Sequence, residues 1–318
     1  MKIGYFLSSE EYSPSELVRQ AGLARRAGVD RLWISDHLHP WNEAQGHSGF
    51  VWSTIGAIAA AVPGVRVTTA VTCPTVRQHP LLVAHAAATC AVLLDGRFQL
   101  GVGSGEALNE HVLAGAWPSI EPRLAMLEEA VTVIRALWQG GSRSHCGEHY
   151  RIDNARIYDL PVEPIPILVS GFGPRSTDLA ARIGDGYCTV SPDPELIERF
   201  RAHGGERKPV QAGAKVCIAG RADDALDLVA RRWPNEALPG ELAQVLPTPA
   251  HFEQACTLVT RDMVAESVPH GPGLDQYVAH CQSFADAGVD ELFLQQIGDD
   301  QEAFFDGPCR ELLARFNT

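Results

Sequence analysis

Titratable side chains cluster directly after two apolar runs of the sequence. Residues 35–41 (Ser-Asp-His-Leu-His-Pro-Trp) follow Arg31–Ile34, a run typical of a buried strand, and Glu106 and Asn109 follow a second strand-like run. An imidazole that titrates near neutrality can act as a general base, and a neighbouring carboxylate can orient it. Because α/β folds place such groups at the carboxyl ends of their strands, the pattern predicts an enzyme.

Further polar residues follow other predicted strands. They are Glu10 after the first strand, Cys73 after the third, and Ser170 with Gly171 after the fifth. Single residues have ordinary structural explanations: His37 alone could be a half-buried histidine with its hydrogen bonds satisfied, and Glu106 would suit the first turn of a helix, where the dipole favours a carboxylate. In a closed parallel barrel all these strand ends lie on one rim, where active sites form. Their convergence favours a catalytic site.

Helices that end on glycine alternate with apolar strands along the chain. Gly28, Gly184 and Gly288 each separate a helical pattern from an apolar run, and glycine readily takes the left-handed conformation that closes a helix. Strands are predicted at 2–7, 31–34, 65–71, 97–101, 165–169, 187–190, 215–219 and 291–294, and helices include 13–26, 82–94 and 122–138. Eight βα units predict an α/β fold of the (β/α)8 TIM-barrel type.

Two segments interrupt this alternation. Residues 140–164 predict an inserted hairpin before the fifth strand, and residues 233–273, with six prolines around one helix-like stretch, predict an insertion between strands seven and eight. Since no linker separates these parts from the rest, we predict a single TIM-barrel domain over residues 1–318 with insertions near 140–164 and 233–273.

Composition limits the partners and the compartment. The net charge of -13 argues against nucleic acid, and no apolar stretch is long enough to span a bilayer. The start of the chain lacks the pattern of a signal peptide, and the eight cysteines lie far apart without a C-x-x-C pair. These features predict a cytoplasmic protein with reduced thiols that acts on a small molecule and binds neither nucleic acid nor membrane.

Two glycine-rich segments suggest ligand contacts. Gly101, Gly103 and Gly105 do not match the spacing of a Rossmann fingerprint, so a nicotinamide cofactor is disfavoured, although they would let a flat ring approach the backbone. Residues 170–173 (Ser-Gly-Phe-Gly) precede a predicted helix, whose N-terminal amides could hold a phosphate. A plain turn between strand and helix would also explain them.

Other functions stay open on these residues. His37 and His39 form an H-x-H pair of the kind that binds zinc in TIM-barrel hydrolases, but the fifth and sixth strands end in Ser170 and Ser191 rather than histidine, so we predict no metal. A barrel that binds a ligand without turnover is a further alternative.

The motifs together resemble a known group of enzymes. Residues 35–41, 72–77 (Thr-Cys-Pro-Thr-Val-Arg), 101–110 (Gly-Val-Gly-Ser-Gly-Glu-Ala-Leu-Asn-Glu) and Trp117-Pro118 are similar to those of coenzyme F420-dependent oxidoreductases of the luciferase-like superfamily. The nearest groups are glucose-6-phosphate dehydrogenases and secondary alcohol dehydrogenases. The resemblance implies a TIM barrel that binds the deazaflavin at its carboxyl-terminal rim, and a homodimer. FMN is the alternative cofactor, in a luciferase-like monooxygenase.

The resemblance also implies roles for individual residues. His37 would be the base that takes the hydroxyl proton, with Asp36 orienting it; Glu106 would supply a proton or charge to the reduced ring; Trp41 and Glu10 would stabilise the transition state. Asp36 would also meet the ring, and a non-proline cis peptide at Ala70-Val71 would support it. The remaining cofactor contacts implied are Cys73, Gly103, Ser104, Asn109, Ser170, Gly171, Phe172 and Gly173.

The substrate expectation rests on a departure from the sugar-phosphate enzymes, which bind phosphate through lysines and an arginine. This chain has Ser191-Pro192-Asp193 after the sixth strand, and Arg261 is the only Lys or Arg between residues 237 and 270. Carboxylates lie near it in the sequence and would repel a dianion: Glu241, Glu253, Asp262 and Glu266. We therefore expect a neutral alcohol or carbonyl substrate rather than glucose 6-phosphate.

Overall fold

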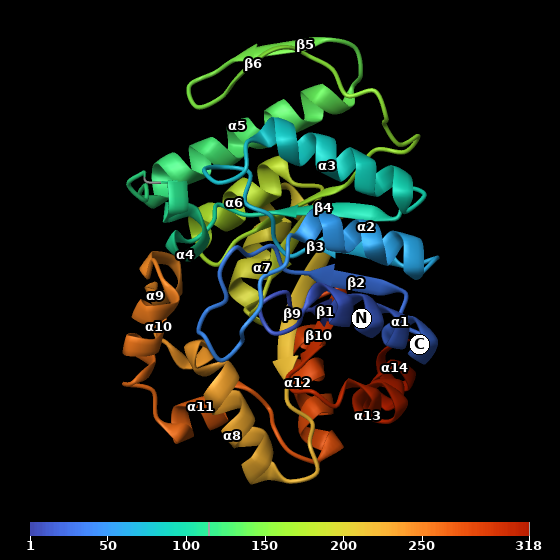
Figure 1. Ribbon diagram of the computed structural model, residues 1–318, viewed down its shortest axis with the longest axis vertical. Coiled ribbons are helices and arrows are strands. Elements are labelled where there is room, and N and C mark those ends of the chain that lie inside the picture. Colours follow the sequence, from blue (N-terminus) through green and yellow to red (C-terminus); the bar gives the residue numbers. More distant parts are fainter. Residues whose placement is uncertain (114, 318) are drawn as a thin grey trace.

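The computed structural model describes residues 1–113 and 115–317. Within these residues, eight parallel strands close into a barrel in the order β1-β10-β9-β8-β7-β4-β3-β2 (Figure 1). The strands are β1 (Lys2–Leu7), β2 (Arg31–Ile34), β3 (Arg66–Thr69), β4 (Phe98–Val102), β7 (Ile167–Ser170), β8 (Gly186–Thr189), β9 (Val210–Val216) and β10 (Glu291–Gln296). The predicted (β/α)8 barrel is confirmed.

Helices surround the barrel and connect its strands (Figure 1). They are α1 (Pro14–Ala27), α2 (Val51–Ala61), α3 (Pro80–Leu93), α4 (Ala107–Glu110), α5 (Ile120–Trp138), α6 (Pro174–Ile183), α7 (Pro194–Phe200), α8 (Ala222–Arg232), α9 (Leu242–Val245), α10 (Pro249–Cys256), α11 (Arg261–Ser267), α12 (Leu274–Asp286), α13 (Gln301–Asp306) and α14 (Pro308–Phe316). Helix α1 has the predicted limits to within one residue, because Ser13 caps its start and Gly28 closes it at φ 100°.

The seventh strand of the barrel begins earlier than predicted. Strand β9 starts at Val210, whereas the apolar run had suggested residue 215. Its first half lacks bulky apolar residues because the barrel interior is already full there. A Cβ on Gly213 would lie 2.9 Å from the Trp33 ring, and the side chain of Gln211 accepts a 2.8 Å hydrogen bond from Trp33.

Aromatic packing fills the interior of the barrel. Trp33 stacks on Phe293 with ring centroids 4.8 Å apart. Partly exposed side chains pack on this buried pair near the carboxyl ends of their strands: Phe6, Ala70 and Val71. The barrel therefore presents a small apolar floor at the end where the candidate residues lie.

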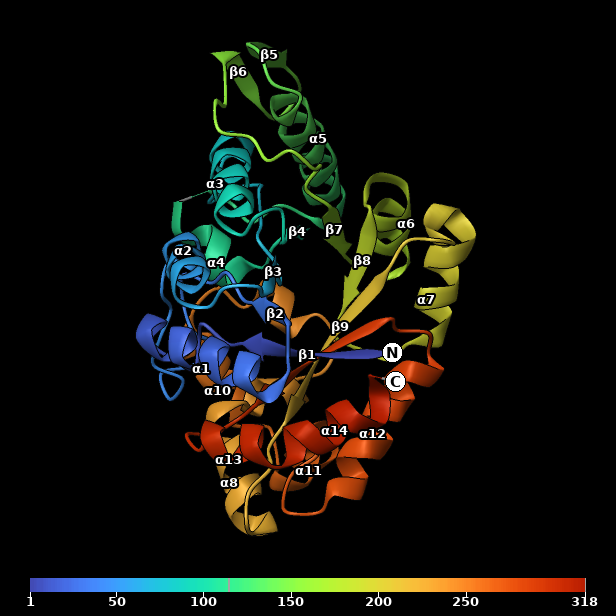
Figure 2. The ribbon, with the colours of Figure 1, turned by 90° about the vertical axis from the view of Figure 1, so that its right-hand side faces the viewer.

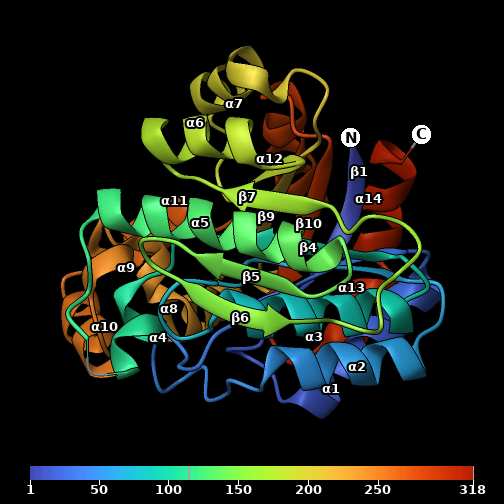
Figure 3. The same cartoon turned by 90° about the horizontal axis from the view of Figure 1, so that it is seen from above.

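Both predicted insertions are present, at opposite ends of the long axis (Figure 2). Strands β5 (Arg143–Cys146) and β6 (Arg151–Ala155) form an antiparallel hairpin that lies over helices α5 and α3, outside the barrel (Figure 3). Residues 233–273 fold into several short helices, α9 to α11 and a 3₁₀ turn at Pro234–Ala237, rather than around one helix as predicted. The prolines explain this, since Pro234 and Pro249 each begin a helical segment.

One predicted core position is exposed. The helical spacing of apolar residues over 82–94 predicts a buried stripe that includes Leu93, but Leu93 is 53% exposed, and Leu82 and Val92 on the same helix are exposed to similar extents. The eight cysteines are free. Among the described residues we find no helix with the length and hydropathy required to cross a membrane.

Candidate functional site

His37 is held at both of its ring nitrogens. Its Nε2 lies 3.3 Å from Glu10 Oε1, and its Nδ1 lies 3.0 Å from the side-chain nitrogen of Asn109 and 3.2 Å from the carbonyl of His39. These contacts come from the segments that follow β1, β2 and β4, so the barrel itself sets the ring's orientation. The side chain of His37 is 12% exposed, and a substrate hydroxyl would have to replace one of these contacts to reach the ring.

Glu10 is the carboxylate that supports His37. Its side chain is buried and accepts hydrogen bonds from Ser8 (2.9 Å) and Ser35 (2.7 Å). Burial alone would raise the pKa of Glu10, but the charge of His37 and these two hydroxyls outweigh it, and the net pKa is lowered. An ionised carboxylate accepts hydrogen bonds and cannot donate one to an oxyanion. The contact of Glu10 in this structure is with His37, and its part in stabilising a transition state stays a prediction.

Asp36 does not take the orienting role predicted for it. Its buried carboxylate accepts hydrogen bonds from Thr72 (2.8 Å), Gln78 (2.7 Å) and Arg77 (3.1 Å). These partners follow β3, and the contacts of the His37 ring are with Glu10, Asn109 and His39 instead, so the structure does not support the prediction that Asp36 orients the imidazole. Its contact with a cofactor ring stays a prediction.

Trp41 links the candidate catalytic residue His37 to the 233–273 insertion. Its ring centroid lies 5.1 Å from that of His37 and 5.1 Å from that of Phe252 in α10. The partly buried Trp41 also packs on the apolar cluster that includes Trp233. The insertion therefore forms an apolar wall beside the imidazole.

Asn109 joins the two motifs that the sequence singled out. Its Oδ1 accepts hydrogen bonds from the amides of Leu38 (2.7 Å) and His39 (3.0 Å), and its amide nitrogen contacts His37 and the carboxylate of Glu106. Glu106 itself is partly exposed at the start of α4. Asn109 thus fixes the loop of His37 against the loop of Glu106, a role that its cofactor assignment did not include.

The glycine-rich segment packs against the loop that follows β3. A Cβ on Gly103 would lie 2.7 Å from Val71, and a Cβ on Gly105, which has φ +79°, would lie 2.5 Å from the sulfur of Cys73. Close packing within the protein therefore accounts for these glycines, where the sequence had suggested room for a ring. The Ala70-Val71 peptide is cis, as predicted, and burial raises the pKa of the Cys73 thiol.

The amides expected to hold a phosphate have partners inside the protein. The N–H groups of Phe172 and Gly173 donate to the hydroxyl of Ser176 (3.2 and 3.3 Å), and that of Gly171 donates to the carbonyl of Cys188. The predicted phosphate contact through these amides is therefore not supported. Ser170 ends β7 at the rim, and a phosphate would have to bind the first turn of α6 beside it.

Sequence reasoning missed two buried acids. Glu11 accepts hydrogen bonds from Arg232 and Trp233, each at 2.8 Å, and so attaches the insertion to the first loop. The carboxylate of Glu110 accepts a 2.6 Å hydrogen bond from the backbone amide of Arg77. Burial raises the pKa of Glu110 to about 7. The only signal in the sequence was that Glu11 and Glu110 directly follow the candidate residues Glu10 and Asn109. Their burial depends on contacts with residues far away in the sequence.

His37 and His39 do not share a site. The ring of His39 contacts the carbonyl of Leu108 at 3.1 Å, while that of His37 contacts Glu10 and Asn109. Among the described residues, no group of three or more His, Cys, Asp and Glu side chains is arranged to hold a metal ion. The arrangement thus gives no support to the hydrolase alternative.

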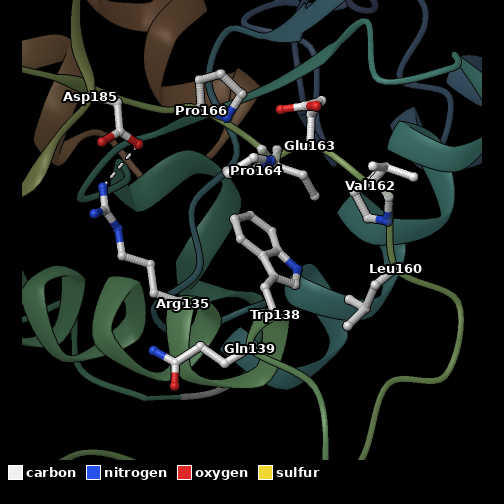
Figure 4. Close-up of a pocket in the computed structure, with 11 residues that line it drawn as sticks. Arg135, Trp138, Gln139, Leu160, Val162, Glu163, Pro164, Pro166 and Asp185 are labelled. Atoms are coloured by element: carbon white, nitrogen blue, oxygen red, sulfur yellow. Dashed lines mark hydrogen bonds and ion pairs between the residues drawn. The ribbon is translucent and has the colours of Figure 1, made fainter.

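A surface pocket of about 470 Å³ lies elsewhere on the molecule (Figure 4). Trp138, Pro166 and the ion pair between Arg135 and Asp185 (3.0 Å) line it. Pro166 and Asp185 precede β7 and β8, so this pocket faces the amino ends of the strands, away from His37. Active sites of TIM barrels form at the other end.

Comparison with known proteins identifies the family. The luciferase-like monooxygenase family matches residues 1–291. The F420-dependent glucose-6-phosphate dehydrogenase of Microbacterium testaceum is 33% identical to this chain, and the match covers 99% of this chain and 97% of the relative. The enzyme of the same name from Nakamurella multipartita is 34% identical, and the match covers 100% of this chain and 97% of the relative. The chain belongs to the F420-dependent branch of the luciferase-like family. This confirms the resemblance that the sequence motifs carried.

Solved structures of luciferase-like proteins agree with this placement. An F420-dependent secondary alcohol dehydrogenase, in complex with an F420-acetone adduct, superposes with a TM-score of 0.91 at 29% identity, covering 98% of both chains. The monooxygenase RslO1 of Streptomyces bottropensis reaches a TM-score of 0.77 at 20% identity, which is a likeness of fold alone. The luciferase-like barrel is therefore shared with monooxygenases, and the relatives at 33–34% identity are F420-dependent enzymes by name.

The residues at the carboxyl-terminal rim suit a flat ring of this family. The floor of Phe6, Ala70 and Val71 is apolar and partly exposed, as a ring face requires. Polar groups at its edge, among them the partly exposed Ser104 and Glu106, could meet the ring's heteroatoms. These apolar and polar side chains together fit a deazaflavin ring.

Proposed function

We propose that this protein is an F420-dependent oxidoreductase that transfers a hydride between an alcohol or carbonyl substrate and the deazaflavin. The observation that supports this best is the arrangement of His37. Glu10 and Asn109 hold the imidazole beside Trp41, at the same end of the barrel as the apolar floor. When bound, the deazaflavin supplies C5 as the carbon that accepts or gives the hydride.

In this proposal the chain's own residues handle the proton and the geometry. His37 takes the proton from the substrate oxygen during oxidation and returns it during reduction, and the ionised Glu10 stabilises the charged imidazole. Trp41 and Phe252 exclude water from one side of the imidazole. Glu106, held by Asn109, supplies a proton or a compensating charge at the ring edge.

The cofactor contacts of this proposal are those carried by the family resemblance. Asp36, Ala70, Val71, Cys73, Gly103, Ser104 and Asn109 would surround the ring and its side chain, and Ser170, Gly171, Phe172 and Gly173 would lie at the phosphate end. Because the amides of 171–173 are already bonded, the phosphate would be held by the start of α6 and by side-chain hydroxyls.

For the substrate, we propose a neutral alcohol or carbonyl compound and not glucose 6-phosphate. Two arginines around the insertion are each paired with two acids: Arg232 with Glu11 and Asp299, and Arg261 with Asp223 and Asp227. Such pairs offer little attraction to a dianion. The names of the relatives favour the sugar phosphate, so a direct comparison of substrates is required.

Two assays test the proposal. Titrations of F420 and FMN into the purified protein should give saturable binding of F420 at far lower concentration than FMN. Reduction of F420 should proceed with secondary alcohols and not with glucose 6-phosphate. Tighter binding of FMN would contradict the cofactor assignment, and rapid saturable turnover of glucose 6-phosphate would contradict the substrate assignment.

We also propose that the protein is a homodimer through α2 and α3. The exposed positions of these packed helices carry no Asp, Glu, Lys or Arg: Ser53, Ala57, Ala60, Ala61, Leu82, His85, Thr89, Val92 and Leu93. An uncharged surface with exposed leucines is typical of a subunit interface. Analytical ultracentrifugation should give a dimer that Leu93→Glu converts to a monomer, and a monomeric wild type would contradict this.

A further inference from the structure

Lys215 projects into the barrel at the end where the reaction residues lie. Side chains of a strand alternate between its two faces. In β9, Gln211 bonds to Trp33 inside the barrel, and a Cβ on Gly213 would touch Trp33 and Phe6 there. Lys215 comes next in this inward series and is one pleat nearer the carboxyl end. Its side chain is 16% exposed.

The ammonium of Lys215 is neutralised by the insertion. Its Nζ lies 2.9 Å from Glu236 Oε1 and 4.3 Å from the ring centre of Trp233. Glu236 belongs to the 3₁₀ turn at Pro234–Ala237, and its side chain is 31% exposed. The second acid near Trp233 is Glu11, whose carboxylate is already occupied by Arg232 and Trp233. Glu236 is thus the partner that balances Lys215.

This ion pair adjoins the wall of the candidate site. Trp233, which carries Lys215 on its face, belongs to the apolar cluster on which Trp41 packs. Trp41 in turn lies against the ring of His37. A substrate whose reacting carbon lies at His37 and whose body extends along this wall would reach the pair of Lys215 and Glu236.

We infer that Glu236 determines the charge of the accepted substrate by neutralising Lys215. With the pair intact, Lys215 and Glu236 together carry no net charge, and this part of the mouth admits an uncharged group. Without the carboxylate of Glu236, the ammonium of Lys215 would attract an anion such as a phosphate or a carboxylate. The inference rests on the proposed function for its meaning, because it specifies the substrate class of the same site.

The test compares anion binding in charge variants of the insertion. Calorimetric titrations of inorganic phosphate, glucose 6-phosphate and glucose are made into the wild type, Glu236→Gln and Glu236→Leu, with and without F420. The matched control is Glu266→Gln, which removes the same charge from an exposed position of the same insertion. A double variant, Lys215→Met with Glu236→Gln, shows whether any gain depends on the lysine.

Both Glu236 variants should bind glucose 6-phosphate about tenfold more tightly than Glu266→Gln does. This change corresponds to about 1.4 kcal/mol, which we expect from one ammonium that has lost its carboxylate partner. Glucose binding should not change, and the double variant should lose the gain. A gain no larger than that of Glu266→Gln, or one that survives removal of Lys215, would overturn the inference. Absence of F420 binding would instead refute the proposed function, since phosphate binding is measured without the cofactor as well.

Discussion

At the scale of single residues, the imidazole of His37 depends on partners from different loops. Glu10 contacts Nε2, and Asn109 contacts Nδ1. The sequence placed His37 and Glu10 on the same rim but assigned the orienting role to Asp36, its neighbour in the chain. Adjacent residues at a strand end point to different sides, and Asp36 turns toward Arg77. Chain proximity was therefore a poor guide to contact.

His37→Ala should remove the base while leaving the apolar floor intact. We expect kcat to fall by about 100- to 10,000-fold, the usual contribution of a general base, with F420 affinity unchanged. His39→Ala is the matched control, because His39 lies on the same loop but contacts the carbonyl of Leu108. Stopped-flow reduction of F420 and a binding titration give both quantities. Equal losses in the two variants would remove His37 from the mechanism.

Glu110 should make the stability of the fold depend on pH. Burial raises its pKa from 4.5 to about 7, so the folded state holds this proton more tightly than the unfolded state. The contribution is present in full below about pH 4.5 and is lost as the pH rises through about 7, on the order of 3 kcal/mol. Glu110→Gln should therefore flatten the fall in unfolding free energy between pH 5 and 8, about the range of this titration.

Urea denaturation across this pH range measures the effect. The exposed Glu148→Gln serves as the control and should follow the wild type. If Glu110→Gln and the wild type lose stability in parallel as the pH rises, the carboxyl of Glu110 titrates normally and the account of its burial is incorrect.

At the scale of elements, patterns of apolar residues were informative where strands are covered on both faces. Strands β1 and β2 have the predicted limits, whereas β9 was misplaced because Gly213 and Gln211 fit against Trp33 rather than contributing bulk. The exposed Leu93 of α3 was likewise assigned to the core, by the helical spacing of apolar residues over 82–94. Burial in these places is decided by partners far away in the sequence.

The attachment of the insertion to the barrel is an element-scale property that can be tested. Glu11 is buried beneath Arg232 and Trp233, and Glu11→Ala would leave the guanidinium of Arg232 without this partner. We expect a loss of about 3–5 kcal/mol in unfolding free energy. The control, Glu302→Ala, breaks an exposed pair with Arg19 and should cost less than about 1 kcal/mol. Equal costs in urea denaturation would show that Glu11 does not hold the insertion.

At the scale of the whole molecule, the closed barrel brings the candidate residues that follow β1, β2, β3, β4 and β7 to one rim. His37 contacts both Glu10 and Asn109 although the three residues follow different strands. The topology could be predicted because eight alternating βα units have one common solution. The hydrogen bonds that the amides of Phe172 and Gly173 make within the protein could not be predicted, because they depend on the side chain of Ser176.

The central claim is that F420 binds at this rim with its reactive carbon next to His37. A crystal structure of the protein saturated with F420 tests it most directly. We predict the ring lying on Phe6, Ala70 and Val71, with C5 facing the side of Trp41 and the imidazole. A ring bound at the pocket beside Trp138, or at the rim with His37 turned away from C5, would contradict it.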